Sequence, residues 1–352
     1  MFNTQNDIRA SLIEAGIDEA SADLLAQQAK PAVWLETRKV EDEAEIPIGA
    51  TKFGGRPDLP AGVAWPVRPP WPNAEKWTKR LRETIAEIDK AKIPDKRRPW
   101  LTPERREEIR RENLEEIRKI ESEQPLSFVA QIDLAQIWAA GLLDEDMPKQ
   151  GVLSIFYDLA ARPWGFDPQD RIGFAILFHD AGGILTRREE PDELQGDENS
   201  HFPPVACTRH ACMTPLPLGT AQYERLDLPD ELSQQVYDWG ESEDSPLHAS
   251  PYGRDWTCHR VGGWPTPIQE DMQIECALVN AGHYCGSGDA HKDPSLAAVR
   301  ATAADWLLLA QIGTDGKGNM VWGDDGQLYL WIRRDDLRAR RFANAWLILQ
   351  CY

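Results

Sequence analysis

Residues 52–60 read KFGGRPDLP, and residues 261–269 read VGGWPTPIQ. In each stretch a Gly-Gly pair is followed two residues later by proline. Strand-like segments then follow in the same order, FVAQIDL (128–134) and GVLSIFYDL (151–159) after the first stretch, LLAQIGTD (308–315) and GQLYLWI (326–332) after the second. Short apolar runs bounded by Gly and Asp are typical of strands. The sequence therefore predicts a single β-rich α+β body made of two sequence-related halves.

Helical segments lie outside this repeat. The first thirty residues predict two short helices, because their apolar residues recur at helical spacing. Residues 74–93 and 103–121 predict a helical hairpin, with Thr102 as N-cap and Pro103 as the first helical residue of its second arm. The hairpin interrupts only the first half, so we interpret it as an insertion. The predicted organisation is N-terminal helices (1–30), a first half (31–180, insertion 73–124), an acidic linker containing Cys and His (181–258) and a second half (259–352).

Composition narrows the class of protein. Of 352 residues 41% are hydrophobic and 28% charged, which is typical of a globular protein. The N-terminal sequence has no signal-peptide pattern, and no run of about 18 apolar residues predicts a membrane span. We therefore expect a cytoplasmic protein with reduced cysteines.

Charge narrows the class of partner. The net charge is −19, with 58 acidic against 39 basic residues. Such a field repels nucleic acid and anionic membranes, and it attracts basic surfaces. We expect a protein partner, basic in character, and neither nucleic acid nor membrane; the sequence leaves self-association open.

The ordered segments together resemble the YwqG-like family, bacterial proteins built around a domain of unknown function. The resemblance rests on KFGGRPDLP, LSFVAQIDL, HRVGGWPTPIQ, LLLAQIGTD and MVWGDDGQLYLWI. It implies an α+β body dominated by β-sheet, with no established activity and no catalytic residues to transfer.

The Gly-Gly pairs are the first candidate site. Glycine adopts positive φ readily, so a structural turn is the favoured interpretation of both pairs. The alternative is a ligand cleft between the two turns, with tryptophans as its walls and polar groups nearby. The residues of this candidate site are Gly54, Gly55, Trp65, Gly262, Gly263, Trp264, His259 and Asp324.

Cysteine and histidine residues are the second candidate. Thiolates and imidazoles are ligands that Zn²⁺ prefers, but their spacing here matches no standard zinc motif. We favour inert cysteines and expect no cofactor, and we keep zinc as the alternative. The residues of that alternative are Cys207, His210, Cys212 and Cys258.

No catalytic motif stands out in the sequence. Our first hypothesis is therefore a non-enzymatic acidic protein that binds a basic protein partner, in its sharpest form an immunity-type role against a bacterial toxin. The alternative is an enzyme, or a small-molecule or metal-binding protein, with its site in a cleft between the two halves.

Overall fold

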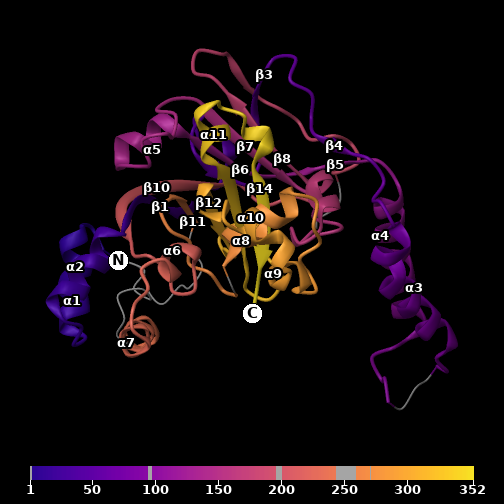
Figure 1. Cartoon of the computed structure of the whole chain (residues 1–352). Helices are drawn as coiled ribbons and strands as arrows, with labels where there is room; N and C mark the ends of the chain where they lie inside the picture. Colours follow the sequence, from indigo (N-terminus) through magenta and orange to yellow (C-terminus); the bar gives the residue numbers. More distant parts are fainter. Residues whose placement is uncertain (1, 94–96, 196–199, 243–258, 270) are drawn as a thin grey trace.

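The computed structural model describes residues 2–93, 97–195, 200–242, 259–269 and 271–352. Ten strands form one antiparallel sheet in the order β14-β13-β12-β11-β1-β10-β2-β6-β7-β8 (Figure 1). Their bounds are β1 (Lys30–Lys39), β2 (Lys52–Phe53), β6 (Ser127–Asp133), β7 (Val152–Tyr157), β8 (Phe174–His179), β10 (Val205–Thr214), β11 (His259–Gly262), β12 (Trp306–Gly313), β13 (Gln327–Arg333) and β14 (Trp346–Gln350). Two short pairs lie beside the sheet, β3 (Asp58–Pro60) with β9 (Leu185–Arg187) and β4 (Val67–Arg68) with β5 (Gln124–Pro125). The predicted β-rich α+β body is confirmed.

The sheet is arranged about its central pair, β1 and β10. The strands β2-β6-β7-β8 lie on one side of this pair, and β11-β12-β13-β14 lie on the other. β6 and β12 each carry a β-bulge at the residue before Ala-Gln-Ile, Val129 in one and Leu309 in the other. The segments quoted from the sequence thus take matching places on the two sides. That the two halves are related in sequence stays a prediction.

The sheet curls until its two edges approach. In β14 the Leu349 amide donates to the Trp164 carbonyl at 3.0 Å, and the Trp346 indole donates to the Gly165 carbonyl. The rings of Phe174 on β8 and Trp346 lie 5.3 Å apart, edge to face. The main core holds apolar side chains from most strands of this curled sheet together with α8 (Met272–Asn280).

The remaining helices cover the sheet or project from it. α1 (Gln5–Glu14) and α2 (Glu19–Gln27) pack with α7 (Asp230–Glu241) in a second apolar cluster. α3 (Ala74–Lys90) and α4 (Pro103–Glu121) form the predicted hairpin, which stands away from the body as an arm (Figure 1). The shorter helices are α5 (Leu134–Ala140), α6 (Ala221–Glu224), α9 (Asp289–Lys292), α10 (Ala297–Arg300) and α11 (Arg334–Arg338).

Segment 181–258, which the sequence predicts as a linker, has a larger role in its described part. It supplies β10, which lies between β1 and β2 in the sheet, and α7. The acidic run that begins at Arg187 has few apolar residues, which is typical of a loop. For this reason the sequence predicts the whole segment as a linker. Residues 196–199 and 243–258 of the segment lie outside the described residues.

Candidate functional site

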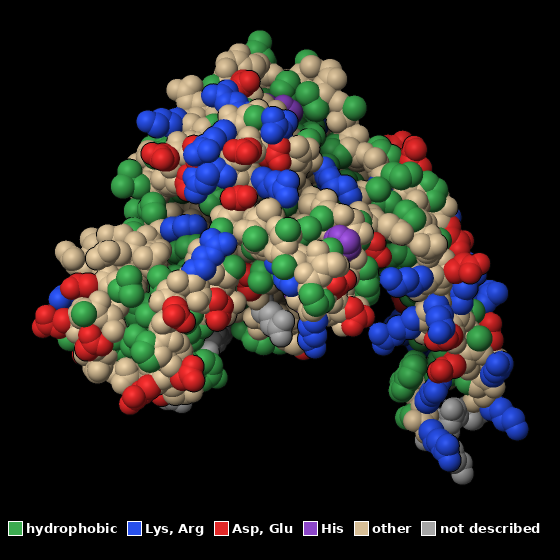
Figure 2. Space-filling model, viewed as in Figure 1, with side chains coloured by type: hydrophobic (Ala, Val, Ile, Leu, Met, Phe, Trp, Pro, Cys, Tyr) green, Lys and Arg blue, Asp and Glu red, His purple; other side chains and the backbone are tan. Residues whose placement is uncertain are grey.

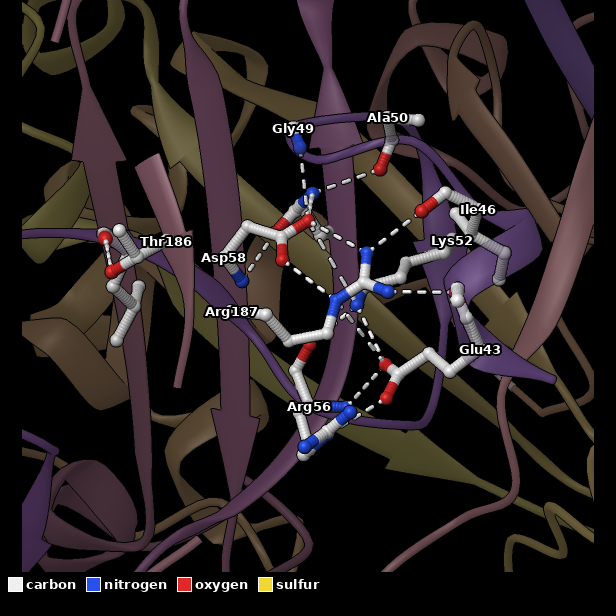
Figure 3. A network of polar contacts seen from close by, with 12 residues as sticks. Glu43, Ile46, Gly49, Ala50, Lys52, Arg56, Asp58, Thr186 and Arg187 are labelled. Carbon is white, nitrogen blue, oxygen red and sulfur yellow. Dashed lines mark hydrogen bonds and ion pairs between the residues drawn. The ribbon is translucent and has the colours of Figure 1, made fainter. Parts of the chain in front are cut away.

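The first Gly-Gly turn lies against an ionic cluster, since a Cβ on Gly55 would meet the Glu43 carboxylate. Figure 3 shows this cluster. Lys52 and Asp58 are fully buried, and the Lys52 ammonium lies 2.9 Å from the Glu43 carboxylate. Asp58 accepts hydrogen bonds from Arg187 at 3.0 Å and from the Gly49 amide at 2.9 Å. The cluster therefore ties the chain before β2 to β9, across more than a hundred residues.

The acids of this cluster are held in their charged form. Burial alone would raise the pKa of Asp58, but the Arg187 hydrogen bond and the Lys52 charge outweigh it and lower that pKa. The pKa of Glu43 is also lowered, because hydrogen bonds that Lys52 and Arg56 donate to its carboxylate outweigh the effect of its burial. The acidic and basic side chains of this cluster form ion pairs with one another, which favours a structural role for the cluster.

Both Gly-Gly turns are held by the glutamine of an Ala-Gln-Ile segment. Gln131 accepts from the Asp58 amide at 2.9 Å, and Gln311 accepts from the Thr266 amide at 2.9 Å. All four glycines have positive φ, between 61° and 78°. All four residues thus use the positive φ that glycine adopts readily.

The space beside the first turn is filled by protein. A Cβ built on Gly54 would lie 2.3 Å from the Pro203 carbonyl oxygen, and one on Gly55 would meet the Glu43 carboxylate. At the second turn, a Cβ on Gly262 would meet the Leu143 side chain at 3.0 Å. The glycines thus allow the chain's own segments to approach closely.

The two tryptophans predicted as cleft walls lie in separate apolar clusters. Trp264 is 3% exposed, its indole donates to the Gln28 carbonyl, and the Lys30 ammonium lies 3.4 Å from its ring centroid. Trp65 donates to the Leu126 carbonyl and packs edge-on against Phe156. The structure does not bring Trp65 and Trp264 together.

His259 and Asp324 are also apart. His259 is 5% exposed, stacks on Phe53 with ring centroids 3.9 Å apart, and faces Asp315 at 3.5 Å. Burial works against the Asp315 charge, but hydrogen bonds from His259 and Thr37 lower the pKa of this carboxyl to about 2. Asp324 lies on an exposed turn. No sequence pattern relates His259 to Asp315, since 56 positions separate them.

The predicted zinc ligands lie on both faces of one strand. His210 and Cys212 alternate with Cys207 along β10, so Cys207 points to the opposite face of the sheet. Cys258 lies outside the described residues. Among the residues described, no group of three or more His, Cys, Asp or Glu side chains is placed to hold a metal ion. The zinc alternative stays a prediction without a constructed site.

The arm is fixed to the body by a buried arginine. Arg68 is 1% exposed, pairs with Asp158, and donates to the carbonyls of Lys119 and Ser122 at the end of α4, each at 2.9 Å. The Trp71 indole also donates to Asp158, at 2.7 Å. A guanidinium is well suited to the free carbonyls of a helix C-terminus, and here it sets where the arm leaves the body.

A cleft of about 1290 Å³ separates α4 from the body. Its α4 wall includes Glu112, Glu116 and Lys119, and its body wall includes Arg162 and Glu193. Burial raises the pKa of Glu116, and the charge of Arg162 opposes that shift. The cleft is therefore a polar groove of mixed charge with a half-buried carboxylate in it.

The profile of a domain of unknown function, DUF1963, matches residues 51–351. The chain belongs to this family. The DUF1963 match includes both Gly-Gly turns, the arm and every strand from β2 to β14. α1, α2, β1 and Glu43 precede it, so the domain is completed in this chain by a central strand from outside the matched region. A search among curated proteins finds no match.

One further property follows from the helices. In the part of the chain that the structure describes, none is both long enough and apolar enough to cross a bilayer.

Proposed function

We propose that this protein is a non-catalytic binding protein that engages a protein partner in the cleft between its arm and its body. The observation that carries the proposal is the anchoring of the arm by Arg68 and Asp158. A helical hairpin attached only by its loops would move freely, whereas a buried ion pair with helix-capping bonds holds it in one direction. Because the arm is held in place, the cleft is already formed in the free protein.

The size and the polarity of the cleft favour a macromolecular ligand. Small-molecule sites are commonly apolar and about 300–1,000 Å³ in volume, whereas this cleft is larger and charged on both walls. Specific protein interfaces bury about 1,200–2,000 Å² and carry polar rims. Charged walls of this kind suit a segment or edge of a folded partner.

The distribution of charge indicates a basic partner for the body. Residues 73–124 hold 15 Lys and Arg against 13 Asp and Glu, a net charge of +2, which leaves −21 for the rest of the chain. Figure 2 shows Asp and Glu over the helices at the lower left and many Lys and Arg side chains along the arm. An acidic body steers a basic partner toward itself, and the association rate then falls as salt rises.

The sharpest form of the proposal is an immunity-type role, in which the acidic body covers the cationic surface of a toxin. The support for this form is the charge of the body and the groove beside it. An immunity-type complex would also require that the covered surface of the partner be its functional one.

A capture experiment with matched variants tests the proposal. Full-length protein is used as bait in a lysate of its own cells at low and at high salt, and captured proteins are identified by mass spectrometry. We expect one basic protein, retained at low salt, that is lost with E116K and with R162E in the cleft. The control E83K changes an exposed side chain of α3 that does not line the cleft, and capture should persist.

Two results would contradict the proposal. One is capture that is equal for bait, cleft variants and control, because the cleft would then not contribute. The other is a complex whose formation does not depend on salt, because steering by the acidic body would then be excluded.

A further inference from the structure

A second buried cation occupies the position of Lys52 in the other half of the sheet. Lys52 and Arg260 each stand two residues before a Gly-Gly pair, and each donates to the carbonyl of the residue four positions later. Each also lies opposite the glutamine of an Ala-Gln-Ile segment, Gln131 or Gln311. The two cations are therefore structurally equivalent, and the groups around Lys52 can be compared with those around Arg260.

Lys52 and Arg260 differ in the number of carboxylates beside them. Lys52 has two carboxylates, Glu43 at 2.9 Å and Asp58 at 3.9 Å. The residue equivalent to Asp58 is Thr266, whose hydroxyl accepts from Arg260 at 3.3 Å. The position that supplies a charge in the first half thus supplies a neutral group in the second.

Arg260 is consequently a buried cation with neutral partners. It is 6% exposed, and its Nη2 donates to the Trp264 carbonyl, the Thr266 hydroxyl and the Gln311 side chain, while its Nε has no hydrogen-bond partner among the described residues. Within those same residues no carboxylate forms an ion pair with it. A buried charge without an opposite charge nearby is costly, because burial removes its hydration and no Coulombic attraction compensates for the loss.

Arg260 also lines a cavity of about 160 Å³ with apolar walls. The cavity lies between β1, β10, β11 and α7, which gather beside the N-terminus in Figure 1. Its apolar lining includes Phe2, Trp34, Trp239, Val236, Pro265 and Pro267. Trp34 is the direct cross-strand neighbour of Arg260, and both residues line the cavity.

We propose that this cavity binds a small monocarboxylate with a compact apolar body, whose carboxylate pairs with Arg260 and whose body packs against Trp34 and Trp239. The ligand carboxylate supplies the negative charge beside Arg260 that Asp58 and Glu43 supply beside Lys52. A guanidinium donates two parallel hydrogen bonds to a carboxylate, which is the geometry that an arginine offers and a lysine does not. An apolar cavity of about 150 Å³ accommodates a benzene ring, so the body of the ligand is about one ring in size.

Benzoate is the probe that tests this assignment on the full chain. Its affinity is measured by isothermal titration calorimetry beside that of benzamide, which has the same ring and no charge. We expect benzoate to bind at least about tenfold more tightly than benzamide, since pairing with a buried charge distinguishes them. Benzenesulfonate, with a larger tetrahedral head, should bind more weakly than benzoate.

Two variants locate the interaction. R260M keeps the length of the side chain and removes its charge, so benzoate should lose its advantage over benzamide. T266D places a carboxylate where the first half has Asp58, so the chain itself should satisfy Arg260 and benzoate affinity should fall at least about tenfold. T186D is the matched control, because it adds the same charge beside the Asp58 cluster and away from the cavity; it should leave benzoate binding unchanged.

The proposal would be overturned by equal affinities for benzoate and benzamide, or by the absence of saturable benzoate binding up to about 10 mM. Equal binding of benzenesulfonate and benzoate would overturn the assignment to a carboxylate. Retention of full benzoate affinity in T266D would also overturn it. Should R260M fail to unfold cooperatively, T266D and the ligand series on the unmodified protein still decide the question.

Discussion

Replacing Gly54 by alanine tests how closely the first Gly-Gly turn is covered by the protein. Gly54 has a φ of 61°, which costs an alanine about 1–2 kcal/mol. The added Cβ would also lie 2.3 Å from the carbonyl oxygen of Pro203 and 2.7 Å from that of Phe202. These are backbone atoms, and the Phe202 carbonyl already accepts from the Gly55 amide at 2.8 Å. Relief of the clash would break that bond.

We expect G54A to lower the free energy of unfolding by about 2–5 kcal/mol. This range adds the conformational cost to about 1–3 kcal/mol for overpacking. The measurement is equilibrium unfolding in urea, followed by tryptophan fluorescence and by circular dichroism. G62A is the control, because Gly62 has a φ of 83° with no atom within 4 Å of a built Cβ, so only the conformational cost applies.

A third variant makes the comparison stricter. The Cβ in G262A would meet the end of the Leu143 side chain at 3.0 Å and the Pro31 carbonyl oxygen at 3.7 Å, an ordinary contact distance. The cost of G262A should therefore lie near that of G62A and below that of G54A. A loss in G54A no larger than that in G62A would refute the reasoning, because the segment at 202–203 could then not lie against the turn.

Three further predictions follow from other buried groups. Burial raises the pKa of Asp170 to about 6 although the Gly165 amide donates to it, so the free energy of unfolding should fall as pH rises from about 4 to about 6. D170N should abolish this dependence and stabilise the protein at pH 7.5 by up to about 3 kcal/mol, as measured by urea unfolding at each pH. A pH profile of stability that is unchanged in D170N would contradict this prediction. D158A leaves the buried Arg68 unpaired and should cost about 3–5 kcal/mol, with faster amide hydrogen exchange at the base of the arm than in the unmodified protein; unchanged exchange there would mean that the ion pair does not hold the arm. Burial raises the pKa of the Cys285 thiol to about 12, so native protein at pH 8 should resist iodoacetamide at this position and react in urea, as mapped by mass spectrometry; rapid native labelling would contradict its burial.

Features that depend on neighbouring residues could be predicted from the sequence. Thr102 accepts from the Arg105 amide as the predicted N-cap, and α4 spans Pro103–Glu121 as expected. The hairpin was predictable because caps, prolines and helical periodicity act within a few residues. The same holds for the Gly-Gly turns, where positive φ is a property of glycine itself.

The parts of the candidate site that were missed depend on residues distant in the sequence. Arg68 and Asp158 are 90 positions apart, and although Asp158 belongs to the repeated segment GVLSIFYDL, no sequence pattern relates it to Arg68. The position of β10 in the middle of the sheet was missed for a related reason. It follows an acidic run that is typical of a loop, and only the pairing of its ten residues with β1 identifies it as a central strand.

By itself, the sequence determined the strand-forming segments, the turns between them, the arm and the acidic character of the body. Each follows from the conformational preference, hydrophobic pattern or charge of nearby residues. Tertiary structure alone decided which strands became neighbours, which charges were buried together and which were left without a partner. Lys52 and Arg260 show the difference, since both precede Gly-Gly as buried cations, yet only Lys52 has carboxylates beside it. The cost of burying a charge depends on the atoms that surround it in space, and segments distant along the chain supply those atoms.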